Sequence, residues 1–164
     1  MLKCSLAHVL TLVLLMSLSL TWHTHQADAA GKLPRFVSLR ADKVNLRVGP
    51  GVRYPISWIY ARKNLPVEIV AEFELWRKIR DREGTEGWVH KSLLSGRRSA
   101  IIGRGVQTLY RRAAGTIPVL RAEGGVQARL LACQKSYCRL RIAGIDGWIE
   151  RSKIWGVYPN EVFD

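Results

Sequence analysis

The chain has 164 residues, with 26 Lys or Arg against 13 Asp or Glu, which gives a formal net charge of +13. A charge of this sign attracts anionic partners and raises the rate at which they are met. Nucleic acid is the first such partner to consider, but the N-terminal segment indicates export, which separates the chain from cytoplasmic nucleic acid.

Residues 1–29 have the features of a secretory signal peptide. Lys3 supplies a positive charge, residues 10–20 form a nearly continuous apolar run, and Ala27-Asp28-Ala29 fits a cleavage site of the A-x-A type. The apolar run is shorter than the ~20 residues that span a bilayer. We therefore expect cleavage after Ala29 and a periplasmic or secreted protein with no transmembrane span; the alternative is an uncleaved membrane anchor.

Two cysteines remain after this cleavage, Cys133 and Cys138, and His90 is then the one remaining histidine. In an oxidising compartment an even pair at close spacing indicates a disulfide, although two free thiols are the alternative. Structural zinc needs four ligands, so this pair makes a poor metal site. We expect a disulfide, no bound metal and no cofactor.

Short strand-like segments follow one another through the first half of the mature chain. In residues 44–48, apolar and polar residues alternate, and Gly49-Pro50-Gly51 then turns the chain sharply. Short strands separated by turn signals predict a small all-β barrel or sandwich, with no helix beyond one turn in "HKSLLSG". The six expected strands are 36–40, 44–48, 56–60, 67–73, 75–80 and 86–90.

The second half repeats the first. Residues 67–96 align with 128–156 with a single one-residue gap, and Gly87-Trp88 then matches Gly147-Trp148. Both glycines should let the backbone pass close to the preceding hairpin. We assign Trp88 and Trp148 to the two cores, because small barrels need large aromatic residues to fill them; the alternative is that they bind ligand.

The segments "VNLRVGPGVRYP", "WRKIR" and "EGWVHKSLL" resemble the bacterial SH3-like (SH3b) domain, strongly over 36–96 and more weakly over 104–158. The second copy keeps "DGWIERSKIWGVYP" but lacks the proline turn. The Cys pair and "WGVYPNE" look like a tandem arrangement of short exported Gram-negative proteins. The resemblance implies an all-β chain of two tandem SH3-like barrels after the signal peptide, with a linker at 97–103 and a tail at 159–164.

The resemblance also implies a groove beside the loop that Gly49-Pro50-Gly51 begins, suited to a short peptide or glycan-peptide. Tyr54 and Trp76 are the candidates for its aromatic wall, and Arg47 is a cationic neighbour. Trp58 lies within the strand "ISWIY" and is interpreted as a core residue. Any groove in the second copy is less well supported, because that copy lacks the proline turn.

Enzyme chemistry finds little support. A cysteine peptidase needs a free cysteine beside a histidine, whereas the cysteines here look paired and His90 lies in the other barrel. We expect a non-catalytic exported module that binds peptidoglycan, a cell-wall peptide or another envelope component. The alternative is a periplasmic protein–protein interaction or scaffold factor; a third interpretation is attachment to anionic host or bacterial surfaces.

Export gives the first testable prediction. Protein extracted from the periplasm should have a mature N-terminus at Ala30, because the A-x-A site ends at Ala29. Mass spectrometry of the intact extracted protein measures this directly. A mass that still includes Met1 would contradict the cleavage.

Overall fold

A computed structural model describes residues 32–162, so the expected signal peptide and its cleavage after Ala29 lie outside the described residues. From Lys32 onward the chain forms one compact unit. Within residues 32–162, no helix is long and apolar enough to cross a membrane.

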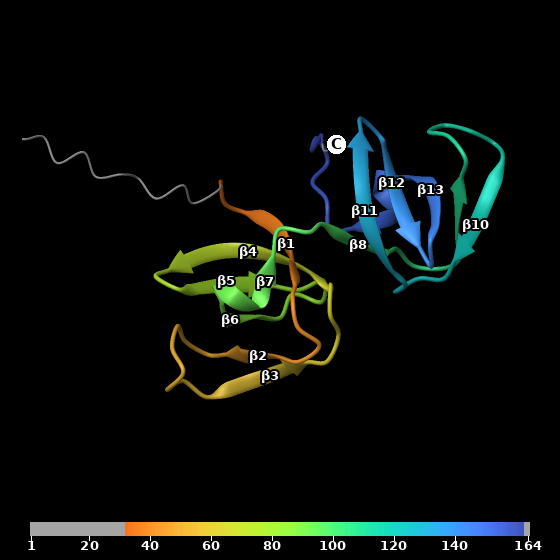
Figure 1. The fold of residues 1–164 in the computed structure, drawn as a ribbon. Coiled ribbons are helices and arrows are strands. Elements are labelled where there is room, and N and C mark those ends of the chain that lie inside the picture. Colours follow the sequence, from red (N-terminus) through yellow and green to blue (C-terminus); the bar gives the residue numbers. More distant parts are fainter. Residues whose placement is uncertain (1–31, 163–164) are drawn as a thin grey trace, which may run out of the picture. The chain divides into compact units, whose positions relative to one another are not determined.

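The first half folds into an antiparallel seven-stranded sheet, here called barrel 1 (Figure 1). Its strands lie in the order β3-β2-β6-β5-β4-β1-β7. The single helical turn expected in "HKSLLSG" is the 3-10 helix η1 (Lys91–Leu93). The strands are β1 (Arg35–Leu39), β2 (Val44–Arg47), β3 (Ile56–Tyr60), β4 (Pro66–Phe73), β5 (Trp76–Arg80), β6 (Glu86–His90) and β7 (Leu94–Ser95).

The second half, barrel 2, has the strand order β10-β9-β13-β12-β11-β8-β14, which is the order of barrel 1 with every strand number raised by seven. The sequence repeat is therefore a structural repeat, down to a matching 3-10 helix, η2 (Arg151–Lys153). Its strands are β8 (Ser99–Ile102), β9 (Gln107–Tyr110), β10 (Pro118–Ala122), β11 (Gln127–Gln134), β12 (Tyr137–Ile142), β13 (Ile145–Glu150) and β14 (Ile154–Trp155).

The expected linker is shorter in the structure than in the sequence interpretation. Residues 99–102, placed in a linker at 97–103, form β8, the buried first strand of barrel 2. The two-residue strands β7 and β14 were also missed, because two residues are too few to show an alternating pattern.

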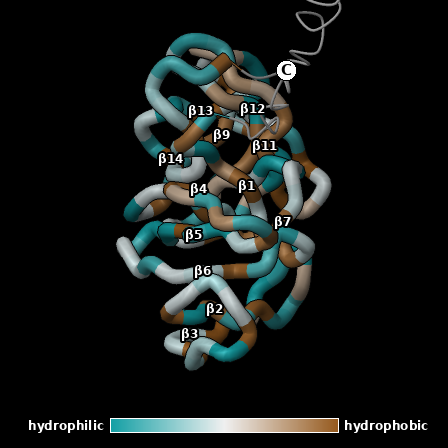
Figure 2. The backbone as a smooth tube through the Cα atoms, turned by 90° about the vertical axis from the view of Figure 1, so that its left-hand side faces the viewer, coloured by the Kyte–Doolittle hydropathy of each residue, from teal (hydrophilic) through white to brown (hydrophobic). Residues whose placement is uncertain are grey.

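Alternation along the strands divides the side chains between core and surface, as the mixed colours of Figure 2 show. In β2, Val44 and Leu46 are fully buried, whereas Asn45 and Arg47 are half-buried on the other face. Each barrel has its own core. The core of barrel 1 is Leu39, Val44, Leu46, Tyr60, Val67, Ile69, Ile79, Val89 and Leu94. The core of barrel 2 is Ala100, Ile102, Leu109, Ala122, Ala128, Leu130, Cys133, Cys138, Leu140 and Ile149.

The assignment of the tryptophans to the cores is wrong. Trp88 and Trp148 are half-buried, and their buried neighbours Val89 and Ile149 occupy the cores instead. The strand places consecutive side chains on opposite faces, so the tryptophan and the aliphatic residue after it cannot both point inward. Trp58 is also not a core residue, since it is 57% exposed on β3, at the end of the strand order.

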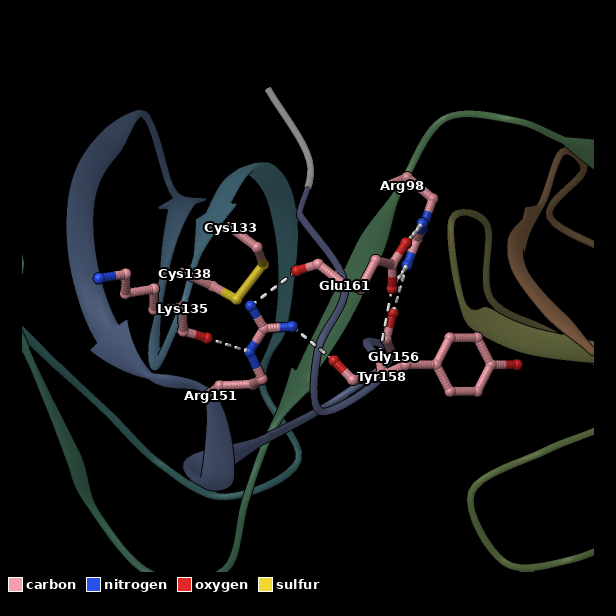
Figure 3. The surroundings of a disulfide bond; sticks show 8 residues. All are labelled: Arg98, Cys133, Lys135, Cys138, Arg151, Gly156, Tyr158 and Glu161. Carbon is pink, nitrogen blue, oxygen red and sulfur yellow. Dashed lines mark hydrogen bonds and ion pairs between the residues drawn. A yellow bond between two sulfur atoms is a disulfide. The ribbon is translucent and has the colours of Figure 1, made fainter.

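The expected disulfide joins Cys133 to Cys138 inside the core of barrel 2 (Figure 3). The two residues lie directly opposite each other on β11 and β12, and both are fully buried. The connecting turn is shorter than the four residues expected, because Gln134 and Tyr137 already pair across the hairpin. At the matching positions of barrel 1, an ion pair between Glu72 and Arg77 replaces the covalent bond.

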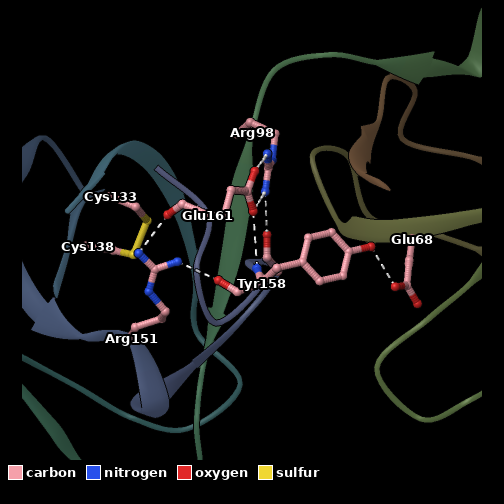
Figure 4. Close-up of polar contacts among 8 residues, drawn as sticks. Glu68, Arg98, Cys133, Cys138, Arg151, Tyr158 and Glu161 are labelled. Atoms are coloured by element: carbon pink, nitrogen blue, oxygen red, sulfur yellow. Dashed lines mark hydrogen bonds and ion pairs between the residues drawn. A yellow bond between two sulfur atoms is a disulfide. The ribbon is translucent and has the colours of Figure 1, made fainter. Parts of the chain in front are cut away.

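Aromatic residues join the two barrels. Phe36 of β1 packs its ring edge-on against Trp155, with centroids 5.1 Å apart, and tilted against Tyr158 at 4.8 Å. The Tyr158 hydroxyl donates a 2.6 Å hydrogen bond to Glu68 of β4 (Figure 4). Glu68 is 7% exposed and also accepts from Arg80, so this buried carboxylate is paired from both barrels. These contacts are called the seam below.

Two arginines, Arg151 and Arg98, hold the segment after β14 in place. The buried Arg151 guanidinium donates to the carbonyl oxygens of Lys135, Tyr158 and Glu161 (Figure 3). Arg98 forms an ion pair with Glu161 and donates to the Gly156 carbonyl oxygen. Through Glu161, the described part of the expected tail is therefore held against barrel 2 and the residue that precedes β8.

The seam predicts the effect of removing one hydroxyl. Tyr158→Phe keeps the ring but takes one donor from the buried Glu68, which should cost about 1–3 kcal/mol of unfolding free energy. Thermal or urea unfolding measures the loss. Tyr137→Phe is the matched control, because Tyr137 is half-buried on β12 and makes no side-chain hydrogen bond within residues 32–162. Equal losses in the two variants would contradict the role of the seam.

Glu161 predicts an acid-dependent part of the stability. Burial acts to raise the pKa of its carboxyl, but hydrogen bonds from Arg98 and the Tyr158 backbone outweigh burial and hold the pKa below its ordinary value of 4.5. A lowered folded pKa stabilises the protein above pH 4.5, and this contribution disappears as the pH falls through the folded value. Glu161→Gln should therefore be less stable than the wild type at pH 7, with the difference shrinking below pH 4.5. Urea unfolding across this range measures it; a difference independent of pH would contradict the prediction.

Candidate functional site

The outer face of β2, β6 and β5 carries an aromatic and cationic surface, here called face 1. Arg47 of β2 lies opposite Trp88 of β6, which lies opposite Lys78 of β5. On the same face, Trp76 lies opposite His90, with ring centroids 5.5 Å apart in an edge-on contact. Trp88 therefore stands between Arg47 and the Trp76–His90 pair.

Gly87 explains why Trp88 stands beside Arg47. A Cβ atom at position 87 would lie 2.6 Å from Leu46 Cγ and 2.9 Å from the Arg47 carbonyl oxygen, so only glycine lets β6 approach β2 this closely. Gly147 has the same role in barrel 2, where a Cβ atom would lie 2.7 Å from Leu109 Cβ. In the structure, the close neighbours of the two glycines are residues of β2 in barrel 1 and of β9 in barrel 2.

The loop after β2 brings Tyr54 to Arg47. The Arg47 guanidinium donates a 2.7 Å hydrogen bond to the Tyr54 carbonyl oxygen. The Tyr54 ring packs on the Gly49-Pro50-Gly51 turn, because a Cβ atom at Gly49 would lie 2.5 Å from that ring. The Arg53 guanidinium carbon lies over the Tyr54 ring, 5.3 Å from its centroid, in a cation–π contact. Tyr54 thus supports the turn that holds Arg47.

His90 has a local structural role. Its Nδ1 lies 2.8 Å from the Ser92 hydroxyl and accepts from the Ser92 backbone N–H, which caps helix η1. The His90 ring therefore links the cap of η1 to Trp76 on face 1.

Charge on face 1 is partly neutralised at one end. Lys78 and Glu86 form a 2.6 Å ion pair, and the hydrogen bond from Lys78 lowers the pKa of the Glu86 carboxyl. Arg80 lies 3.7 Å from the same carboxylate. Arg47 makes no ion pair within residues 32–162, so it is the cation of face 1 that can pair with a ligand.

Barrel 2 has the matching surface, face 2, with different side chains. Tyr110 and Arg139 flank Trp148, and Tyr137 lies opposite Glu150. A cavity of about 160 Å³ opens here, lined by Thr108, Tyr110, Ala114, Gly115, Tyr137, Glu150 and Lys153. A neighbouring cavity of about 300 Å³ shares Gly115 and is lined by Arg111, Arg112, Thr116 and Ile117.

Sequence reasoning missed face 2, because the second copy lacks the proline turn. The matches of Trp76 with Tyr137 and of Trp88 with Trp148 were the available signal, since both pairs occupy equivalent positions of the two sheets. Neither surface shows metal-binding chemistry: residues 32–162 contain no group of three or more His, Cys, Asp or Glu side chains that could hold a metal ion.

Comparison with known proteins places this geometry in a family. Residues 40–96 and 106–156 each match the family model of the bacterial SH3 domain. The chain belongs to the bacterial SH3 domain family. The expected resemblance and the all-β fold of two tandem domains are therefore confirmed, and the two barrels are its two SH3 domains. Bacterial SH3 domains are generally binding modules, typically extracellular or periplasmic, and members of the family bind cell-wall components.

Among solved structures, the chain is similar to NlpC1 and NlpC2 from Trichomonas vaginalis, at 15% and 11% identity and TM-scores of 0.36 and 0.35. It spans about half of those proteins, covering 48% and 49% of them with 79% and 76% of its own length. Likeness at this level does not bear on function. No curated protein matches the chain.

The tight contact at Gly87 predicts a sharp difference between two glycines. Gly87→Ala should lower the unfolding free energy by about 1–3 kcal/mol, because the new methyl group would overlap Leu46 and the Arg47 backbone. Gly96→Ala is the matched control, since a Cβ atom there has no heavy atom within 4 Å. Urea unfolding of both variants tests this, and equal stability of the two would contradict the close approach.

Proposed function

We propose that the protein is a non-catalytic exported module that binds peptidoglycan, through its peptide or glycan parts, at the aromatic faces of its two SH3 domains. The observation that carries the proposal is the group of Arg47, Trp88 and Trp76 on face 1, where half-buried rings stand near a cation that has no ion pair within the described chain. Face 2 supports it with a similar group on the equivalent strands.

This chemistry suits a cell-wall ligand. Indole and phenol rings offer flat apolar area with polar edges, which stacks on sugar rings and on the backbone of a peptide. Peptidoglycan peptides also carry carboxylates, which an arginine can bind with two parallel hydrogen bonds. The excess of basic residues would draw such an anionic polymer toward both faces.

A binding function without catalysis fits the groups on the two faces. His90 Nδ1 accepts the backbone hydrogen bond that caps η1, and the ring contacts Trp76, so these contacts give the imidazole a local structural role. The cysteines are joined in a buried disulfide, so neither is a nucleophile.

The second candidate function is binding of a protein partner, and β3 favours it. This strand lies at the end of its sheet and exposes Ile56, Trp58 and Ile59 by 45%, 57% and 47%. An apolar edge strand is a template for strand addition by another chain. Substitution of Trp58 should therefore affect binding of a protein partner at β3 but not binding of the cell wall at face 1.

Retention on purified, protein-free peptidoglycan sacculi tests the proposal. Trp88→Ala should weaken retention strongly, by about 2 kcal/mol or more if the indole is a central contact. Arg47→Ala should weaken it mildly and make it less dependent on salt, because an exposed charge is screened. Thermal melts check that the variants remain folded.

Trp58→Ala is the matched control, since it removes the same side chain from a strand outside face 1. It should leave retention on sacculi unchanged. If the wild-type protein is not retained, the cell-wall proposal fails and a protein partner at β3 is favoured. If Trp58→Ala loses retention while Trp88→Ala keeps it, face 1 is not the binding site.

A further inference from the structure

A larger recess, distinct from faces 1 and 2, lies where the two SH3 domains meet. Its volume is about 740 Å³, within the range of ligand sites. One wall is the β5–β6 turn of barrel 1, with Arg82 and Glu83. The other wall consists of the β8–β9 and β10–β11 turns of barrel 2, with Arg104 and Glu123. We call this recess the junction groove.

The barrel 1 wall is held rigidly by Asp81, which is 8% exposed. Its Oδ1 accepts from the backbone N–H groups of Glu83 and Thr85, at 3.1 and 2.8 Å, while the Tyr60 hydroxyl donates to its Oδ2 at 2.9 Å. Tyr60 belongs to the core of barrel 1, so the turn that presents Arg82 and Glu83 is fixed to that core.

The barrel 2 wall depends on glycine. A Cβ atom at Gly124 would lie 2.6 Å from the Gly103 carbonyl oxygen and 3.1 Å from the Gly105 nitrogen, so the two turns pack backbone against backbone. Gly125 adopts a φ of 86° and donates to the Ile102 carbonyl oxygen at 2.9 Å. Arg82 donates across the junction to that same oxygen, at 3.3 Å.

The four charges of the groove are not satisfied by one another. Two are cationic and two are anionic, yet none of the four forms an ion pair within residues 32–162. Because both signs line one recess, a ligand that carries both signs would meet complementary charges there. The backbone of both walls is fixed by these contacts, which lowers the part of the entropic cost of binding that comes from ordering the turns.

We infer that the junction groove binds a zwitterionic peptide segment, with its carboxylate at Arg82 and Arg104 and its ammonium group at Glu83 and Glu123. The inference names a peptide subsite within the proposed cell-wall function, because cell-wall peptides carry free carboxylates and free amino groups. It requires both SH3 domains, since each contributes one arginine and one glutamate.

The experiment titrates the purified full-length protein with trialanine and follows the backbone amide signals of Gly105, Gly124 and Gly125 by NMR. Trialanine has both free termini, N-acetyl-trialanine lacks the ammonium group, and trialanine amide lacks the carboxylate. Trialanine should shift these signals at millimolar concentration, and each cap should weaken binding about threefold to fivefold, as expected for exposed charge pairs.

Two variants assign the ends of the peptide. Arg104→Gln should weaken trialanine binding about threefold to fivefold and remove the effect of the amide cap, because the cap and the variant delete the same interaction. Glu123→Gln should likewise remove the effect of the acetyl cap. Arg62→Gln and Glu74→Gln change the same residue types at exposed positions outside the groove and should leave binding unchanged.

The inference is overturned if trialanine leaves the three glycine signals unchanged, if neither cap weakens binding, or if only the amide cap matters, which would make the groove a simple anion site. It is also overturned if the control variants weaken binding as much as the groove variants. Trp88→Ala should not affect trialanine binding. Failure of the wild-type protein to be retained on sacculi would therefore count against faces 1 and 2 and leave the groove in place.

Discussion

A buried carboxylate holds the two SH3 domains of this protein together. Glu68 is taken out of water in barrel 1, and that burial is costly unless its oxygens are fully paired. Barrel 1 supplies Arg80, and barrel 2 supplies the hydroxyl of Tyr158. Phe36 packs against Tyr158 beside this bond, so apolar contact and polar pairing act at one place. The seam and the hydrogen bond from Arg82 to the Ile102 carbonyl oxygen both hold the two domains where the turns of the junction groove face each other.

The two domains use one framework for two different surfaces. Every strand of barrel 1 has its counterpart in barrel 2, and a tryptophan after a close-packed glycine stands at the centre of each face. The side chains around it differ: Arg47 and His90 in the first domain are replaced by Tyr110 and Glu150 in the second. A framework with separate cores allows this divergence, because the outer face of one domain can change without repacking the other.

The strands of the fold could be predicted from the sequence, because alternation is a local signal that a few residues carry. The same alternation also predicts the position of Trp88, because the buried Val89 places its neighbour on the outer face of the strand. The core assignment followed the size of the indole instead of this alternation. Trp58 was misplaced for another reason: its strand is apolar but lies at the end of the sheet order. The seam and the junction groove could not be predicted, because they join residues as far apart as Glu68 and Tyr158, which no local pattern connects.

The burial of the disulfide determines when it can be reduced. Both sulfur atoms belong to side chains with no solvent exposure, at the centre of the barrel 2 core. Thiol–disulfide exchange requires a thiolate to reach one of the sulfurs, so reduction has to wait until barrel 2 opens. While barrel 2 stays closed, it therefore keeps the oxidation state in which it folded. Whether Cys133 and Cys138 are joined in a folded molecule therefore depends on the compartment in which that molecule folded.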